Sequence, residues 1–491
     1  MTIYIKNHLF HYEIENLCRL FFPNEKLTVI KDPVNILEEK SYIYTECKNK
    51  KDKQTLFVLV KLEGSVFQKE CVVESQEENL ERETERRFAV LLYQLLSGIT
   101  RSIPPWGILT GVRPIKLMRR FTEEIGLEKT IFHFSKKFLV SDEKIALSVQ
   151  TMKKEQEILD LSQKNSFSLY ISIPFCPTRC SYCSFVSQSV KRAARLIPEY
   201  VSLLCEEIKH TGLIAKDLGL HLETVYVGGG TPTTLSPQQL EELFLAIKKN
   251  FEMDTCREFT VEAGRPDTIT KEKLTVMKEA GVTRVSINPQ TMNDKVLQEI
   301  GRKHTVQETI DSYVLTKKME FDSINMDVIA GLPSDTANSF ENTLTEICKL
   351  QPDSITVHTL CMKKASELTA EGQKLTRKAA EEASKMNRFA EKKLKEENYF
   401  PYYLYRQSRM VGNLENVGWA QKGKEGLYNV YVMDETHTVL ACGAGAVSKL
   451  KDPQGTYLER IFNFKFPYEY MARFQEMMRR KEQVKEFYDK L

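Results

Sequence analysis

The sequence lacks any long apolar run, and no stretch approaches the roughly eighteen uninterrupted apolar residues that a transmembrane helix needs. Its first residues also lack the basic-then-apolar order of a secretory signal peptide. The sequence also has little excess of charge of either sign, because 70 Lys and Arg residues are balanced by 67 Asp and Glu residues. We therefore expect no membrane span and no nucleic-acid partner that needs a broad basic surface.

Paired cysteines are missing as well. The 11 cysteines are an odd number, and outside one triplet they are scattered along the chain. This pattern gives no disulfide framework and favours a reducing, cytoplasmic location. A zinc ribbon is disfavoured, because it needs two separated CxxC pairs and the sequence has no second pair.

The chain does contain enough apolar residues to build full cores. Its 491 residues, 42% of them hydrophobic and 28% charged, indicate a globular protein of several domains. We expect an N-terminal α+β domain of unknown role at 1–164, a core domain at 165–365, and a smaller α+β domain at 366–491 that covers the substrate.

Residues 1–75 have the alternating, β-branched pattern of strands. We predict strands at 2–6, 26–31, 41–48 and 55–62, a helix at 76–98, and two or three helices within 122–164. The turn-rich segment 102–116 contains Arg113 and Lys116. That segment is either a packing turn or a place where a bidentate Arg binds a carboxylate.

From residue 168 onward, strand and helix patterns alternate, which is typical of an α/β fold with a parallel sheet and outer helices. We predict strands at 168–173, 223–227, 258–263, 283–287, 323–329 and 353–359, and helices at 195–217, 237–250, 271–280, 305–319 and 336–350. Right-handed crossovers would close this sheet into a full or partial (β/α) barrel.

Unusual residues end or follow each predicted strand. In chain order they are Cys176, Cys180, Cys183, Gly228–Thr233, Glu262, Gln290, Asp327 and Cys361. Because the chemistry of such barrels lies at the carboxyl ends of the strands, we expect one small-molecule site at this rim.

The three clustered cysteines form a CxxxCxxC triplet. Three thiolates on one short loop can hold three irons of a [4Fe–4S] cube and leave the fourth iron open. A vacant coordination position is what a catalytic metal centre needs. Structural thiols that lie close together by chance are the alternative interpretation.

Two motifs together, YxxxPFCxxxCxYC at 170–183 and GGGTPT at 228–233, resemble the radical S-adenosylmethionine (SAM) superfamily. Within it, the sequence is similar to the oxygen-independent coproporphyrinogen III oxidase (coproporphyrinogen dehydrogenase) family, in particular its HemZ-type branch. The resemblance is strong from Tyr170 to Cys361. It implies a [4Fe–4S] cluster on Cys176, Cys180 and Cys183, with SAM bound beside it.

The same resemblance implies a set of residues that contact SAM. Glu262 could accept a hydrogen bond from the ammonium or ribose, and Arg302 could pair with the carboxylate. Cys361 matches a small residue near the adenine, although a buried structural thiol is an equal alternative there. The full expected set is Tyr170, Tyr182, Gly229, Gly230, Thr231, Glu262, Gln290, Arg302, Asp327 and Cys361.

The resemblance also implies a reaction and partners. SAM is cleaved by one electron, and the resulting radical takes a hydrogen from a propionate side chain of coproporphyrinogen III. Loss of CO₂ and an electron leaves a vinyl group, twice, which gives protoporphyrinogen IX in haem biosynthesis. An electron donor such as a flavodoxin or ferredoxin is implied. Basic candidates for the tetrapyrrole carboxylates are Arg179, Lys303, Arg406 and Arg409.

Two positions depart from the family pattern. Phe185 stands where coproporphyrinogen dehydrogenases carry an extra cysteine, and Ser172 stands where they carry a histidine. The related haem chaperones also lack that cysteine, and they bind and transfer haem on the same fold. A haem chaperone, or a radical SAM enzyme for another tetrapyrrole, therefore stands beside the dehydrogenase as an alternative.

Overall fold

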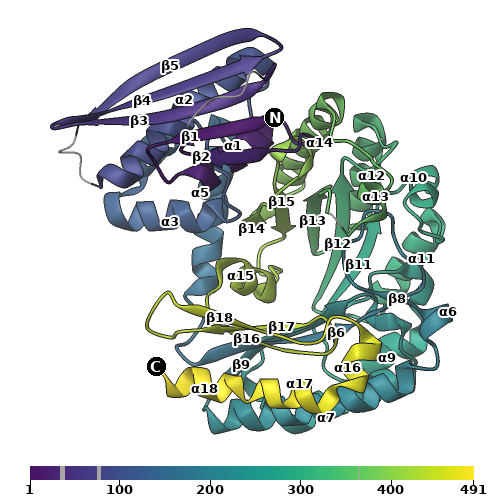
Figure 1. Ribbon diagram of the computed structural model, residues 1–491. Helices are drawn as coiled ribbons and strands as arrows, with labels where there is room; N and C mark the ends of the chain where they lie inside the picture. Colours follow the sequence, from purple (N-terminus) through teal and green to yellow (C-terminus); the bar gives the residue numbers. More distant parts are fainter. Residues whose placement is uncertain (34–38, 75–78, 364) are drawn as a thin grey trace. The chain divides into compact units, whose positions relative to one another are not determined.

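The computed structural model describes residues 1–33, 39–74, 79–363 and 365–491. The chain forms two compact units (Figure 1). The first contains residues 1–149, 374–381 and 405–415, and the second contains 150–373, 382–404 and 416–491. The expected division into three domains stays a prediction.

The first unit contains a five-stranded sheet in the order β2-β1-β3-β4-β5. All four strands predicted in this region are present, and a fifth strand and a helix were not predicted. Strand β5 was missed because most of its side chains are exposed, so no apolar alternation marks it. The elements are β1 (Thr2–Lys6), α1 (His11–Phe21), β2 (Thr28–Lys31), β3 (Tyr42–Lys50), β4 (Lys53–Leu62) and β5 (Ser65–Glu74).

Helices complete this unit and lead into the second one. Helix α2 (Leu80–Thr100) corresponds to the helix predicted at 76–98, of which residues 76–78 lie outside the described residues. Its buried Phe88, Leu92 and Leu96 share a core with the sheet. The remaining helices are α3 (Pro114–Ile125), α4 (Leu127–Phe132), a π-helical turn (His133–Lys137) and α5 (Asp142–Leu159).

The second unit is built on an 11-stranded sheet in the order β14-β15-β13-β12-β11-β10-β9-β6-β16-β17-β18. All six predicted strands are present as consecutive parallel neighbours, which confirms the α/β fold class. They are β6 (Ser166–Ile173), β9 (His221–Gly229), β10 (Glu258–Glu262), β11 (Arg284–Gln290), β12 (Ser323–Ala330) and β13 (Ser354–Thr359). The predicted helices are α7 (Ile197–Asp217), α8 (Pro237–Asn250), α9 (Lys271–Glu279), α11 (Val306–Lys317) and α12 (Ala337–Leu350).

Side chains on these strands alternate between two kinds of surroundings. Residues such as Val227, Val261 and Val328 are fully buried and apolar. Their neighbours along the chain include Glu262 and Asp327, which the period of two places on the opposite face. That second face is therefore polar, and its residues are available to bind a ligand.

The C-terminal segment extends the same sheet at both ends. Strand β15 (Asn416–Ala420) pairs antiparallel with β13, and β14 (Phe400–Tyr405) lies beyond it. Strand β16 (Thr438–Cys442) pairs parallel with β6, and β17 (Val447–Lys451) and β18 (Leu458–Phe462) continue from it. The sheet therefore has a seventh parallel strand that the sequence did not predict.

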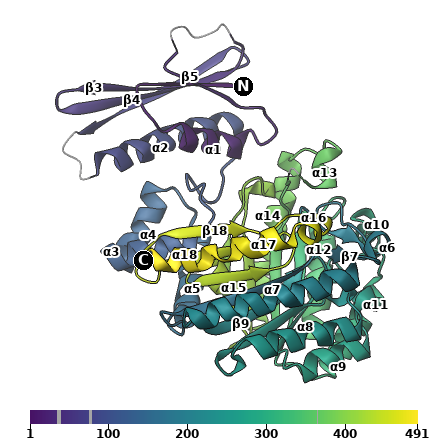
Figure 2. The ribbon, with the colours of Figure 1, turned by 60° about the horizontal axis from the view of Figure 1, so that its bottom comes forward.

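Helices from distant parts of the chain pack together outside this sheet (Figure 2). Helix α7 packs against α8, and α16 (Pro467–Ala472) and α17 (Phe474–Lys481) pack against α7. Inside, the backbone N–H groups of Leu427 and Tyr428, at the start of α15 (Leu427–Asp434), donate to the Glu258 carboxylate. None of the helices in the described part of the chain has the length and apolarity to cross a bilayer.

Candidate functional site

The cysteine loop begins directly after β6. Cys176 ends the short strand β7 (Phe175–Cys176), which pairs with β8 (Gln188–Ser189) and so closes the base of the loop. Cys180 is buried, and Cys176 and Cys183 are half-buried. None of the three forms a disulfide bond with another cysteine of the described chain.

Hydrogen bonds join this loop to the turn that follows α10 (Asp294–Glu299). Thr178 Oγ1 donates to the Gly301 carbonyl at 2.8 Å, and the Ser181 N–H donates to the Ile300 carbonyl at 3.1 Å. Gly301 has φ +78°, and a Cβ there would lie 2.9 Å from the Arg179 carbonyl oxygen. Only glycine therefore permits this close approach.

Burial raises the pKa of Cys176, and it raises the pKa of Cys183 to about 11. Both sulfurs therefore keep their protons at neutral pH unless a metal replaces them. No group of three His, Cys, Asp or Glu side chains among the described residues is arranged to hold a single metal ion. A cluster makes a different demand, because each thiolate binds a separate iron.

The glycine turn after β9 is clamped to the cysteine segment. The N–H groups of Gly230 and Thr231 donate to the carbonyls of Ile173 and Phe175, each at 2.8 Å. Thr231 Oγ1 lies 3.5 Å from Cys176 Sγ. A Cβ on Gly230 would lie only 2.6 Å from the Phe175 carbonyl oxygen, so this cradle cannot accept a side chain.

Glu262 lies at the end of β10 and accepts a 2.5 Å hydrogen bond from Tyr226. Burial raises the pKa of Glu262 to about 7, and the nearby charge of Asp327 adds to this effect. The Tyr226 ring stacks with those of Tyr170 and Tyr428, with centroids 6.2 and 4.3 Å away, and the Tyr170 and Tyr428 centroids are 6.3 Å apart, so the three rings form a triangle. Tyr226 and Tyr428 were not predicted as site residues.

Asp327 has the opposite protonation preference. Burial disfavours its ionised form, but hydrogen bonds and charge attraction from His358, together with hydrogen bonds from Asn325 and Thr356, outweigh burial and lower its pKa. His358 Nε2 lies 3.6 Å from its carboxylate, and Asn325 donates to it at 2.7 Å. This polar face thus holds one anionic carboxylate beside one that titrates near neutral pH.

The side chains of Gln290 and Arg302 are both buried. Gln290 ends β11 with φ 71°, a strained value for a residue with a side chain. Arg302 donates to the carbonyls of Asn288 and Gly264, and its Nη2 lies 3.3 Å from Tyr182 Oη. Gln290 Oε1 and Arg302 Nε have no hydrogen-bond partner among the described residues.

The other predicted residues are placed as follows. Cys361 is half-buried and follows β13 by two residues. Arg179 is exposed and lies 3.9 Å from Glu367, and Lys303 is exposed close by in the chain. Phe185 is 65% exposed.

Two of the proposed basic partners, Arg406 and Arg409, belong to the first unit. Arg406 is buried, and its guanidinium donates to the Leu109 carbonyl at 2.7 Å and to Asn413 Oδ1 at 2.7 Å. It also lies 5.3 Å from the Trp106 ring centroid. These contacts join the 102–116 segment to the 405–415 segment, so Arg406 has a packing role inside this unit.

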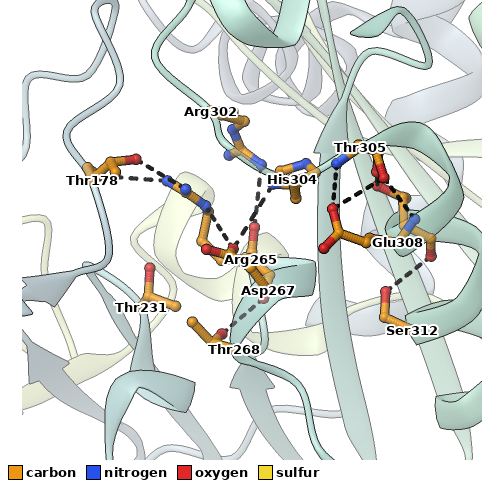
Figure 3. Close-up of polar contacts among 12 residues, drawn as sticks. Thr178, Thr231, Arg265, Asp267, Thr268, Arg302, His304, Thr305, Glu308 and Ser312 are labelled. Atoms are coloured by element: carbon orange, nitrogen blue, oxygen red, sulfur yellow. Dashed lines mark hydrogen bonds and ion pairs between the residues drawn. The ribbon is translucent and has the colours of Figure 1, made fainter.

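Sequence reasoning missed a buried group beside the cysteine loop, which Figure 3 shows. Arg265 donates to Thr178 and lies 3.3 Å from Asp267 Oδ1, and His304 lies 3.9 Å from the same oxygen. Neither ring nitrogen of His304 has a hydrogen-bond partner in the part of the chain that the structure describes. Arg265 and Asp267 follow the end of β10 closely, in VEAGRPD, which is the signal that could have found them, whereas His304 lies in GRKH, after α10 (Asp294–Glu299).

The chemistry of these residues fits a cluster with an adjoining SAM. Three thiols on one loop suit the cluster, and the glycine turn beside them offers backbone to a ligand. SAM carries an ammonium, a carboxylate and a ribose, which match Glu262, Arg302 and Asp327. The unpaired atoms of Gln290 and Arg302 add an acceptor and a donor that a polar ligand would satisfy.

Comparisons with known proteins agree with this assignment of cofactors. A family model described as "Radical SAM superfamily" matches residues 170–347 of this chain. The chain is 41% identical over 389 residues to the oxygen-independent coproporphyrinogen-III oxidase-like protein HemZ of Bacillus subtilis (strain 168), covering 78% of this chain and 77% of that protein. It is 36% identical over 194 residues to the heme chaperone HemW of the same organism, covering 39% and 50%.

Among solved structures, the coproporphyrinogen III oxidase HemN of Escherichia coli, described as a radical SAM enzyme, matches with a TM-score of 0.51 and 21% identity. The match covers 66% of this chain and 72% of that one, and it supports the fold. The chain belongs to the radical SAM superfamily, in the HemZ-type branch of the oxygen-independent coproporphyrinogen III oxidase family, and its cofactors are a [4Fe–4S] cluster and SAM.

Proposed function

We propose that this protein is an oxygen-independent coproporphyrinogen dehydrogenase, which converts two propionates of coproporphyrinogen III to vinyl groups and yields protoporphyrinogen IX. The observation that carries the proposal is the 41% identity to the HemZ oxidase-like protein over 77% of that protein's length. The match covers 389 residues and so extends well beyond the radical SAM region at 170–347.

In this proposal the residues at the strand ends divide the work. Cys176, Cys180 and Cys183 would hold the cluster, and the backbone of Gly229 and Gly230, with Thr231, would face the amino group of SAM. When bound, the cluster and SAM together supply one-electron cleavage that starts hydrogen removal from the substrate.

Four side chains would orient SAM, namely those of Glu262, Asp327, Arg302 and Gln290. Glu262, with its raised pKa of about 7, must ionise to pair with an ammonium, and a bound cation favours that ionisation. Asp327 is already anionic and suits the ribose hydroxyls. Arg302 would pair with the SAM carboxylate through its fork, and Gln290 would hydrogen-bond a polar atom of the nucleoside.

The stacked tyrosines would exclude water from this polar face. Tyr428 is buried and Tyr170 and Tyr226 are half-buried, and this burial raises the pKa of each phenol. All three therefore remain neutral and present apolar ring faces. Of the basic residues considered for the propionates, Arg179 and Lys303 lie in the same unit as the cysteines.

A haem chaperone is the second candidate. Phe185 occupies the place of the extra cysteine, which the haem chaperones also lack, and its side chain is 65% exposed. The heme chaperone HemW of B. subtilis shares 36% identity with this chain over 194 residues. A radical SAM enzyme for another tetrapyrrole is a third candidate, which 5′-deoxyadenosine formation with that tetrapyrrole alone would identify.

The deciding experiment is anaerobic. The reconstituted protein is incubated with SAM, a flavodoxin or ferredoxin reducing system and coproporphyrinogen III, and products are separated by mass. We expect losses of CO₂ and two hydrogens per propionate, and no product when SAM is omitted. Stoichiometric haem binding without any vinyl product would favour the chaperone, and 5′-deoxyadenosine formed only with another tetrapyrrole would favour the third candidate.

We also propose that the protein works in the reducing cytoplasm. The thiols Cys176, Cys180 and Cys183 must remain reduced until a cluster is inserted, and an oxidising compartment would pair them.

A further inference from the structure

Arg265 is a buried cation that touches the cysteine loop directly. Its exposed fraction is 3%, although an arginine is almost never buried without a partner. It follows β10 by three residues, on the loop before α9. One of its terminal nitrogens, Nη1, lies 3.8 Å from Cys180 Sγ.

Three further contacts fix the plane of this guanidinium (Figure 3). Nη2 donates to Thr178 Oγ1 at 3.0 Å, and Nη1 lies 3.4 Å from the Thr178 carbonyl oxygen. On its other side, Nε lies 3.3 Å from Asp267 Oδ1. Arg265 therefore binds Thr178, which lies between Cys176 and Cys180, through two of its nitrogens. Its third nitrogen contacts Asp267, which fixes the guanidinium from the other side.

We propose that Arg265 is a positioning residue for the cluster, which holds the cysteine loop and stabilises the reduced state of the cluster. This inference rests on the cluster assigned to the cysteine triplet and is independent of the tetrapyrrole. Reduction adds one electron to a centre already surrounded by thiolates. A fixed cation and its N–H groups at a ligand sulfur favour the more negative state, and so raise the reduction potential.

Arg265 differs from Arg302 in what surrounds it. Arg302 also interacts with Cys180, but its nearest partners are the Asn288 carbonyl and Tyr182. By family resemblance Arg302 serves the SAM carboxylate. The contacts of Arg265 go to the cysteine loop and to Asp267, so its effect should fall on the cluster.

The test compares three substitutions that remove different parts of the side chain. Arg265→Lys keeps the charge, Arg265→Gln keeps an N–H donor without charge, and Arg265→Met keeps neither. Each anaerobically reconstituted variant is assayed for iron and sulfide, and its midpoint potential is measured by a redox titration followed by electron paramagnetic resonance without SAM. Arg284→Met is the matched control, because Arg284 is equally buried and donates to Ser323 and Ser354, on other strands.

We expect a midpoint potential near the wild-type value in R265K, a more negative one in R265Q and the most negative in R265M, with no shift in R284M. If R265M fails to retain iron, the comparison of R265K with R265Q tests the same claim. Loss of iron from both neutral variants, with retention in R265K, supports the positioning role alone. Full iron content with one potential across all three variants would overturn the proposal.

None of these measurements uses coproporphyrinogen. A negative result in the decarboxylation assay therefore leaves this proposal standing, and unchanged potentials leave the decarboxylation proposal standing.

Discussion

Two buried polar clusters of the second unit differ in how completely their atoms are paired. Around Glu207, which is fully buried, each carboxylate oxygen accepts two hydrogen bonds. Oε1 accepts from Asn463 at 2.7 Å and from Lys481 at 2.9 Å. Oε2 accepts from the Gly443 N–H and the Tyr470 hydroxyl, both at 2.7 Å.

At the strand ends the pairing is incomplete. Gln290 Oε1, Arg302 Nε and both ring nitrogens of His304 are buried and lack partners within the described ranges. Each such atom costs about 1–3 kcal/mol when nothing completes it. The Glu207 cluster is therefore fully hydrogen-bonded and has a structural role, whereas the strand-end cluster has the unpaired atoms expected where a ligand binds.

The largest effect expected concerns the cluster itself. Replacing Cys180 by Ala removes one of three thiolates, so we expect the iron content after reconstitution to fall to background and the brown absorbance to disappear. Cys205→Ala is the control, because Cys205 lies on α7, outside the triplet. Full iron content in the Cys180 variant would show that the ligand assignment is wrong.

Disrupting the Glu207 cluster should lower the free energy of unfolding. Glu207→Ala leaves the buried Lys481 ammonium without its carboxylate, and breaking such a pair costs about 3–5 kcal/mol. Denaturant unfolding of the apoprotein measures this loss. A loss below about 1 kcal/mol, the value typical of an exposed pair, would mean that the Glu207 cluster does not have this structural role.

The strand-end site should respond to pH. The folded-state pKa of Glu262 is raised from 4.5 to about 7, so the folded protein binds more protons than the unfolded chain between these values. The contribution of Glu262 to the free energy of unfolding of the apoprotein is therefore fully present below pH 4.5. This contribution falls by about 3 kcal/mol as pH rises through 7. Unfolding measured at pH 5 and pH 8 in wild type and Glu262→Gln isolates it, since the variant should lose the extra pH dependence. The same slope in both proteins would contradict the assignment.

SAM affinity should fall in the same variant. Glu262→Gln replaces a charged acceptor, and a hydrogen bond to a charged group contributes about 1.5–3 kcal/mol, so Kd should rise about tenfold to hundredfold. Binding of SAM to the reconstituted protein can be followed calorimetrically at pH 8. Glu258→Gln is the matched control, because Glu258 lies on the same strand but caps α15. Equal Kd values in wild type and E262Q would remove Glu262 from the SAM site.

The smallest effect is expected at Phe185. Its side chain is largely exposed, so Phe185→Cys should change the free energy of unfolding by less than about 0.5 kcal/mol and leave the iron content unchanged. Gain of vinyl product in this variant, from a parent without it, would show that the missing cysteine sets the function.

Much of the fold was predictable because its signals are local. The alternation of Val225 and Val227, or of Met326 and Val328, marks buried strands within a few residues, and the six core strands were predicted nearly to their ends. The pairing of β16 with β6 was not predictable, since it joins Thr438 to Phe167 across most of the chain. Strand β5 was missed for a different reason, because its exposed side chains carry little pattern.

The site divides along the same line. Residues within recognisable motifs, such as Gly229, Glu262 and Asp327, were named from sequence, and their roles toward SAM stay predictions. Arg265 and His358 were missed because their importance depends on contacts with Thr178 and Asp327, far away in the chain. Such contacts leave no periodic signal in the sequence.

The central claim is that the cysteine triplet and the polar strand ends form one site. The most direct test is the electron paramagnetic resonance spectrum of the reduced cluster, recorded with and without SAM in wild type and in Glu262→Gln. We predict that SAM alters the wild-type spectrum, and that the variant needs at least tenfold more SAM for the same change. SAM binding that leaves the wild-type spectrum unchanged would contradict the account.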